Sequence, residues 1–215
     1  MRTTDKDLLR RSISCCAVSL LLFGLAGLCV PSLAQTTERK PGISFGLSAG
    51  LFYSQEKAFR VLYGTVHIPL GVQLSCALSE RIGFLVGYKY LSSSGGTVLI
   101  GPGFVQETHP LSFKNSSLRF GATYNVNLAK RSAMFVGGGA SYNFFKERWE
   151  VIPLSRNGKK FGFFIQTGNV HDFGKRFSIL TLLEYTNIPT GKGAKLQEGV
   201  NLGGLELALG LSFRL

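Results

Sequence analysis

The chain has few cysteines and few acidic residues, and both shortages limit what it can be. Three of its four cysteines, Cys15, Cys16 and Cys29, precede residue 30, which leaves Cys76 alone in the remainder. One cysteine can form neither an internal disulfide nor a cysteine-based metal site. The chain has 12 acidic residues against 24 lysines and arginines. Such an excess favours anionic partners, and outside the cytoplasm anionic lipid is a commoner one than nucleic acid.

Long apolar runs are also scarce: residues 13–30 form one, and the later apolar stretches are broken by glycine and polar residues. A basic segment precedes this run, and Ser32-Leu33-Ala34 follows it as a small-residue cleavage site. The alternative is a membrane-spanning helix, for which the run is about long enough. The order of basic, apolar and small-residue segments favours a cleavable secretory signal. We therefore predict a signal peptide at 1–34, a short polar leader at 35–41 and one domain at 42–215.

What the chain has in abundance is two-residue alternation, which is clearest in its last segment. One face of that segment holds Leu205, Leu207, Leu209, Leu211, Phe213 and Leu215. The other face holds Gly204, Glu206, Ala208, Gly210, Ser212 and Arg214. Successive side chains of a strand point to opposite faces, so the pattern predicts a strand with one apolar and one small or polar face. Seven more such segments precede it, at 42–53, 66–77, 82–90, 118–128, 133–145, 159–171 and 177–186.

The segments between these strands are alternately long and short. The predicted loops are 54–64, 92–117, 146–158 and 187–200, and the predicted short turns are 78–81, 129–132 and 172–175. Eight strands with this alternation are typical of outer-membrane barrels, which have short periplasmic turns and longer extracellular loops. Aromatic residues near the strand ends fit an interfacial girdle.

The alternative fold is a soluble up-and-down barrel or a sandwich, in which the apolar faces would point inward. Glycine-rich faces would then be exposed to water, although glycine weakens a strand and suits the crowded inside of a narrow barrel better. We therefore predict an all-β fold: an eight-stranded antiparallel up-and-down transmembrane β-barrel. Its apolar side chains face lipid, and its small and charged side chains face the lumen.

The end of the chain also resembles a known family. Residues 208–215 (ALGLSFRL) resemble the C-terminal assembly signal of bacterial outer-membrane proteins, through Gly210, Phe213 and Leu215. Leu215 replaces the usual terminal phenylalanine. The run 183–187 (LEYTN), followed by a loop and a final strand, resembles the small OmpA-like and opacity-type barrels. The resemblance implies the outer membrane of a Gram-negative bacterium, and contact with the barrel-assembly machinery during biogenesis.

Charged residues on the lumen side are the first candidate functional group. By strand parity the side chains of Lys89, Arg119, Glu184, Glu206 and Arg214 all point inward. A charge inside a narrow lumen must be paired or hydrated. We expect a salt-bridge network that plugs the barrel; the alternative is a gate that admits small ions.

The chain also resembles, more weakly, the PagL-like lipid A deacylases, whose seventh strand carries a His-x-Ser-Asn motif. The matching positions are Glu184, Tyr185, Thr186 and Asn187, so the histidine and the serine are both replaced. Without an imidazole no general base activates the hydroxyl. The three remaining histidines, His67, His109 and His171, share no strand position with a serine or aspartate partner. We expect no catalytic residues, cofactor or metal.

A basic cluster lies on or beside the third predicted outer loop: Lys146, Arg148, Arg156, Lys159 and Lys160. It is either a solvated loop or a contact for the phosphates of lipopolysaccharide. Together these observations predict a non-enzymatic, monomeric barrel with a structural or surface-interaction role. Its expected partners are outer-membrane lipids and lipopolysaccharide, with no nucleic acid. The alternatives are an inactive lipid A-modifying enzyme and a narrow channel for small solutes.

Overall fold

The computed structural model describes residues 42–98, 108–129, 131–149, 155–189 and 201–215. The predicted signal peptide and leader lie outside the described residues. The chain forms, in order, β1 (Ile43–Ser54), α2 (Lys57–Tyr63), β2 (Val66–His67), β3 (Leu70–Ala77), β4 (Ile82–Val98), β5 (Thr108–Ala129), β6 (Ser132–Trp149), β7 (Ser155–Phe173), β8 (Phe177–Asn187) and β9 (Gly204–Arg214).

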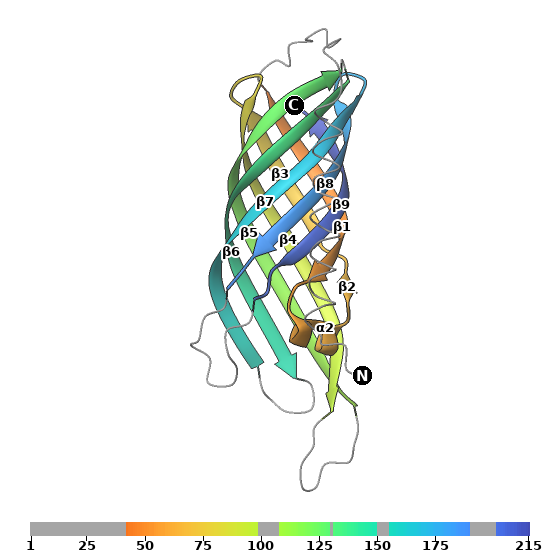
Figure 1. The fold of residues 1–215 in the computed structure, drawn as a ribbon, viewed down its shortest axis with the longest axis vertical. Coiled ribbons are helices and arrows are strands. Elements are labelled where there is room, and N and C mark those ends of the chain that lie inside the picture. The colour runs from red at the N-terminus through yellow and green to blue at the C-terminus, as the bar shows by residue number, and fades with distance from the viewer. Residues whose placement is uncertain (1–41, 99–107, 130, 150–154, 190–200) are drawn as a thin grey trace, which may run out of the picture. The chain divides into compact units, whose positions relative to one another are not determined.

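These strands close into an antiparallel ring (Figure 1). Within the described residues the ring has eight members, in the order β1, β3, β4, β5, β6, β7, β8 and β9. The pairing of β1 with β9, from Ser44 opposite Arg214 to Ser54 opposite Gly204, closes it. Closure pairs both sides of each strand over the middle of the wall, while β4 beyond Tyr90 and β7 before Phe163 extend past their partners β3 and β8. The predicted all-β fold and strand number are confirmed.

The segment predicted as the second strand, 66–77, is interrupted in the structure. Its two parts, β2 and β3, pair with β1 in one continuous register, with His67 opposite Phe52 and Leu70 opposite Ala49. The interruption falls at Pro69, which has no N–H to give to the ladder. Its carbonyl oxygen still accepts a hydrogen bond from the Gly50 N–H at 3.2 Å. The two parts therefore make one wall position of the barrel.

Four strands are longer than the alternation predicted. The loop predicted at 92–117 is wrong over much of its length, because β4 and β5 stay paired from Leu91 opposite Asn115 to Val98 opposite Thr108. The loop predicted at 146–158 is similarly shortened by β6 and β7. The outward positions of these extensions carry polar residues such as Ser92, Ser94 and Lys114, so the apolar outer face ends there. Backbone pairing needs no such face, which is why the extensions escaped prediction.

Side-chain orientation follows the predicted parity. Leu47, Leu209 and Phe161 are 53%, 64% and 74% exposed on the outside of the wall, whereas Glu184 and Arg119 inside it are 1% and 6% exposed. Among the described residues, no helix is long and apolar enough to cross a membrane. The predicted apolar outer face is confirmed, and Arg119 and Glu184 lie inside as predicted, but the inner face also holds large apolar side chains such as Leu85 and Phe164.

The inside of the barrel holds two apolar clusters at different heights. The first, toward α2, contains Phe52, Phe59, Tyr63, Leu91, Leu111, Phe113 and Phe145. We call it the aromatic plug. The second, toward the short turns, contains Phe135, Leu180, Leu182 and Ala208. Along β8 and β9 the buried glutamates Glu184 and Glu206 follow directly on the second cluster, so a charged layer lies between the two apolar ones.

The aromatic plug includes a short helix that was predicted as loop. Phe59 and Tyr63 lie one turn apart on the buried face of α2. The Phe59 ring meets the Phe113 ring edge-on at 5.0 Å, and the Tyr63 hydroxyl donates to Glu147 at 2.5 Å. The helix ends at Gly64, whose φ of 94° favours glycine. The first loop therefore folds back into the outer end of the lumen.

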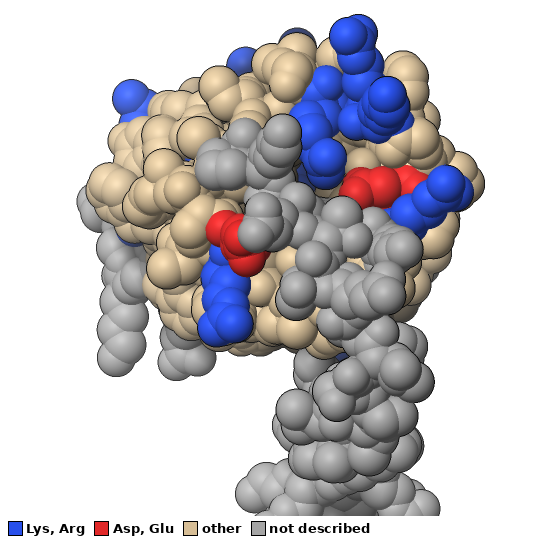
Figure 2. Space-filling view, turned by 90° about the horizontal axis from the view of Figure 1, so that it is seen from above, with Lys and Arg blue, Asp and Glu red and all other residues tan. Residues whose placement is uncertain are grey.

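The end with the short turns carries basic side chains around its rim (Figure 2). The turns and the residues beside them supply Arg81, Arg131, Lys175 and Arg176. Arg131 and Arg176 also give backbone carbonyl oxygens to neighbouring strands, accepting from the N–H groups of Asp172 and Arg214 at 2.7 and 2.8 Å. Part of the excess positive charge of the sequence is therefore located at this end of the wall.

Candidate functional site

Two buried glutamates on neighbouring strands form the base of the candidate site. Glu184 of β8 and Glu206 of β9 are directly opposite each other in the ladder. Both point inward because they share the parity of the buried residues of their strands. Like charges placed opposite each other destabilise a sheet. The pair therefore requires a cation from elsewhere in the barrel.

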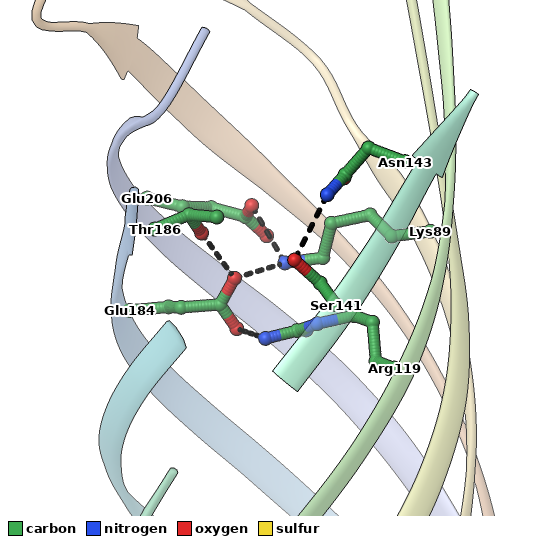
Figure 3. A network of polar contacts seen from close by, with 7 residues as sticks. All are labelled: Lys89, Arg119, Ser141, Asn143, Glu184, Thr186 and Glu206. Carbon is green, nitrogen blue, oxygen red and sulfur yellow. Dashed lines mark hydrogen bonds and ion pairs between the residues drawn. The ribbon is translucent and has the colours of Figure 1, made fainter. Parts of the chain in front are cut away.

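Lys89 of β4 supplies that cation from another part of the wall (Figure 3). Its Nζ donates to Glu184 Oε1 at 2.9 Å and to Glu206 Oε2 at 2.8 Å. Arg119 of β5 donates to the other Glu184 oxygen, Oε2, at 2.5 Å. Two cations thus meet two carboxylates, and the formal charge of the group is zero. We call these four residues the lumen network.

Neighbouring groups hold the lumen network in place. The Thr186 hydroxyl donates to Glu184 Oε1 at 3.0 Å. The Arg119 guanidinium carbon lies 3.9 Å from the centroid of the Phe164 ring, a cation–π distance. Asn143 donates to the Ser141 hydroxyl at 2.9 Å on the next strand (Figure 3). The Thr186 and Phe164 contacts restrict the rotamers of Glu184 and Arg119, which gives their ion pair a defined geometry.

The lumen network is almost inaccessible to solvent. The side chains of Lys89, Arg119, Glu184 and Glu206 are 14%, 7%, 1% and 4% exposed. A cavity of about 40 Å³ borders all four of them. A single water needs about 10–15 Å³ on this kind of measure, so the space takes a few waters at most. Chemically, the group acts as a neutral polar barrier across the lumen.

Arg214, the fifth residue predicted for this group, lies elsewhere. Its Nη2 is 3.7 Å from Asp172 Oδ2, and Asp172 also accepts from the Ser178 hydroxyl at 2.6 Å. Arg214 shares the inward parity of Glu206. It is eight residues further along β9, however, which is about 26 Å of extended chain. Parity gave the correct face of the strand but not the height in the barrel.

The structure divides the predicted basic cluster between two faces of the wall. Lys146 and Arg148 on β6 and Lys159 on β7 are exposed on the outer face, in line with the apolar residues of those strands. Arg156 and Lys160 are half-buried and have the opposite parity. Lys114 of β5 joins the outer group, since it is exposed and directly opposite Lys146. Sequence reasoning missed Lys114 because its segment was predicted as loop.

The residues that resemble an assembly signal lie on β9 or just after it. The Phe213 ring is 5.2 Å from that of Phe177 on β8, and Leu215 is 74% exposed. Gly210 allows β9 to approach β1, because a Cβ there would lie 2.5 Å from the Leu47 carbonyl oxygen.

Two histidines have serine partners, so the prediction that none does is wrong. The His67 Nδ1 is 2.6 Å from the Ser93 hydroxyl, and its Nε2 is 3.0 Å from the Gly64 carbonyl oxygen. The His171 Nδ1 is 2.7 Å from the Ser132 hydroxyl. These partners come from different strands, so no motif in the sequence could reveal them.

The His67–Ser93 pair has the hydrogen bonds of a base and a nucleophile but not the surroundings. His67 and Ser93 are 7% and 5% exposed and belong to the inner face. The edge of the Phe59 ring of α2 contacts the imidazole at 5.3 Å. The partner of the second imidazole nitrogen is the Gly64 carbonyl oxygen rather than a carboxylate. The pair links His67, which follows the first loop, to β4 of the wall.

No protein-family model and no curated protein matches this sequence. The fold does match solved structures. Neisserial surface protein A is 13% identical with a TM-score of 0.59, covering 82% of this chain and 100% of its own. The outer membrane protein OprG from Pseudomonas aeruginosa is 12% identical with a TM-score of 0.61, covering 85% and 99%.

A third solved structure is Ail, the attachment invasion locus protein of Yersinia pestis, in complex with the heparin analogue sucrose octasulfate. It is 13% identical with a TM-score of 0.51, and covers 82% of this chain and 100% of its own. The fold of this chain is thus that of the small eight-stranded outer-membrane barrels. The shared fold and the apolar outer face support an outer-membrane location. Within the described residues, no group of three or more histidine, cysteine or acidic side chains is placed to hold a metal ion.

Proposed function

We propose that this outer-membrane barrel is a non-enzymatic, monomeric scaffold with a closed lumen, which presents the outer parts of β4–β7 for contact with the envelope surface. The observation that carries this proposal is the lumen network. Three ion pairs among two cations and two carboxylates reach across the barrel with little room for water beside them. Breaking such pairs to open a path leaves buried charges uncompensated, which is costly.

The aromatic plug supports the same proposal at the outer end. The rings of Phe59, Tyr63 and Phe113 fill the space through which a solute would have to enter. Tyr63 is also tied to Glu147 of β6, so the helix is fixed to the wall by a hydrogen bond as well as by packing. A solute would therefore meet two independent barriers in series.

The length of the central strands supports the surface role. A strand needs about 9–11 residues to cross a bilayer at a tilt. β5 has 22 residues and β7 has 19. The surplus stands beyond the hydrocarbon region, and a paired sheet is a rigid platform for a partner. Contacts with outer-membrane lipids, and with the barrel-assembly machinery through Gly210, Phe213 and Leu215, belong to this proposal, as does the absence of nucleic acid as a partner.

Planar-bilayer recording of the refolded protein tests the closed lumen. The expected result is no stepwise conductance, because the lumen network and the plug both obstruct ion passage. Steady single-channel steps from the folded barrel would favour the narrow channel and overturn the scaffold. The double variant Lys89→Ala/Glu206→Ala is the matched control, because it removes both ion pairs of Lys89 and leaves Arg119 paired with Glu184, without a net charge. Brief openings in that variant alone would locate the barrier at the network.

Incubation with purified lipid A tests the absence of catalysis. The expected result is no release of fatty acid, since the His67–Ser93 pair faces away from lipid. Release that Ser93→Ala abolishes would refute the non-enzymatic proposal and assign the activity to that pair.

A further inference from the structure

Four basic side chains form a row on the outer face of the barrel wall. They are Lys114 of β5, Lys146 and Arg148 of β6, and Lys159 of β7, and all four are exposed. Lys114 is directly opposite Lys146. On the other side, Lys146 is opposite Asn157 and Lys159 is opposite Phe144, so Lys146 and Lys159 are diagonal neighbours. Direct neighbours have Cβ atoms about 5 Å apart and diagonal ones about 7–8 Å. We call these residues the outer basic row.

Within the part of the chain that the structure describes, the outer basic row has no counter-charge. Among the described residues, none of its four members takes part in an ion pair. Glu147, which lies between Lys146 and Arg148 in sequence, has the opposite parity and accepts from Tyr63. Two lysines opposite each other in a ladder repel. An external anion that neutralises several of these charges at once would relieve that repulsion.

The row lies directly next to a cluster of lipid-facing rings. Moving from the row toward the middle of the wall, the next outward residues are Phe144 and Tyr142 on β6 and Phe161 on β7. The Tyr142 ring is 4.8 Å from the Phe144 ring and 4.7 Å from the Phe161 ring. The Lys159 Nζ lies 5.8 Å from the Phe144 centroid. Aromatic belts mark the level of the membrane interface, so the row lies at the height of lipid phosphates.

We infer that the outer basic row binds the phosphate groups of lipid A in the outer leaflet, with the acyl chains packed along Phe144, Tyr142 and Phe161. Paired lysines and an arginine provide several charge-assisted donors to phosphate oxygens. This inference rests on the proposed function only through the outer-membrane location. It names a partner and a contact surface, and holds whether or not the lumen conducts.

The position of the row favours a lipid over a soluble polyanion. A polysaccharide or a nucleic acid in solution would bind most easily at the rim or the inner face of the extended strands. Arg156 and Lys160 point to the inner face, which is the opposite face from the lipid-facing rings. The outer basic row instead continues the lipid-facing surface. A ligand that has both phosphate and acyl chains satisfies both parts of the site.

Binding of purified lipid A to the refolded chain in detergent micelles tests this site. The test variant is Lys114→Ser/Lys146→Ser/Lys159→Ser, and the matched control is Arg156→Ser/Lys160→Ser, which removes charge from the other face of the same strands. We expect the test variant to lose affinity about tenfold or more, because each basic group near an anionic lipid contributes measurably. The control should stay within about twofold. Dephosphorylated lipid A should bind the native protein as weakly as lipid A binds the test variant.

Three outcomes would overturn the inference: unchanged affinity of the test variant, equal losses in the test and control variants, or equal binding of phosphorylated and dephosphorylated lipid A. Heat-modifiable migration on a gel verifies that each variant is folded. If the triple variant does not fold, Lys146→Ser alone serves instead, with an expected loss of about threefold. The binding assay does not involve the lumen, so its failure is distinguishable from a failure of the conductance test.

Discussion

Replacing Lys89 by methionine isolates the energetic role of the lumen network. The substitution keeps most of the side-chain volume and removes the one cation that contacts both glutamates, at 2.9 and 2.8 Å. Glu184 keeps Arg119 and the Thr186 hydroxyl. Glu206, 4% exposed, loses the ion pair that the described structure gives it. Removing one partner of a buried pair costs about 3–5 kcal/mol, so we expect the free energy of unfolding to fall by that amount.

A second substitution separates charge from packing. In Lys89→Met/Glu206→Gln the unpaired carboxylate is gone, and Glu184 still has Arg119. Glu206→Gln alone weakens the hydrogen bond to the Lys89 ammonium, which should lower the free energy of unfolding by about 1.5–3 kcal/mol. If the two effects were independent, the double variant would lose their sum. We expect it to be more stable than Lys89→Met, because the cost of that variant lies in the carboxylate left behind.

Urea unfolding in lipid vesicles measures these differences. Trp149 is the single tryptophan of the chain and packs against the aromatic plug, so its fluorescence reports on the folded lumen. Lys175→Met, an exposed turn lysine, is the control and should change stability by less than about 0.5 kcal/mol. The reasoning fails if Lys89→Met unfolds within about 1 kcal/mol of the native protein, since this is below the range for a broken buried pair. It also fails if the double variant shows the full sum of the single losses.

Three further predictions concern the packing and the plug. Gly139→Ala should destabilise the barrel by about 1–3 kcal/mol, because the added Cβ would lie 2.0 Å from the Phe120 carbonyl oxygen. The control is Gly46→Ala, whose added Cβ would be 3.7 Å from its nearest neighbour, and this variant should be near neutral in the same urea titration. Phe113→Ala should cost about 3–5 kcal/mol and accelerate proteolysis of the first loop, and an unchanged cleavage rate would contradict the plug. Burial and the Glu147 hydrogen bond raise the pKa of Tyr63 well above its ordinary value of about 10. The resulting stabilisation is present below pH 10 and declines above it, so the stability difference between the native protein and Tyr63→Phe should shrink from pH 10 upward and stay constant below.

The transmembrane part of the fold could be predicted because one physical constraint governs it. A wall with lipid on one side and a crowded lumen on the other imposes strict alternation, and β1 and β9 carry it over their whole length. Beyond the bilayer this constraint disappears. The outward positions around Ser94 and Ser112 are polar, so their composition resembled a loop, although Leu111 and Phe113 pack inward against the aromatic plug. The helix α2 has seven residues, too few for a clear periodicity, and its Phe59–Tyr63 spacing was its one signal.

The lumen network was half predictable for a related reason. Parity places a side chain inside or outside, and this was enough to place Lys89, Arg119, Glu184 and Glu206 in the lumen. Which of these groups meet depends on the register around the ring and on height in the barrel, as Arg214 demonstrates. The partners of His67 and His171 were hidden in the same way, since a serine on another strand leaves no local pattern.

The two faces of the wall treat charge in opposite ways, and the difference has a physical cause. Inside, two cations and two carboxylates form a neutral group, because a buried charge has no solvent to compensate it. Outside, four cations stand together without a described acidic partner. Water and mobile ions screen such an excess in part, and an anion fixed beside it would neutralise it more fully. At the boundary of an aromatic belt the available anion is a lipid phosphate, so the same rule that closes the lumen assigns the outer basic row to the membrane.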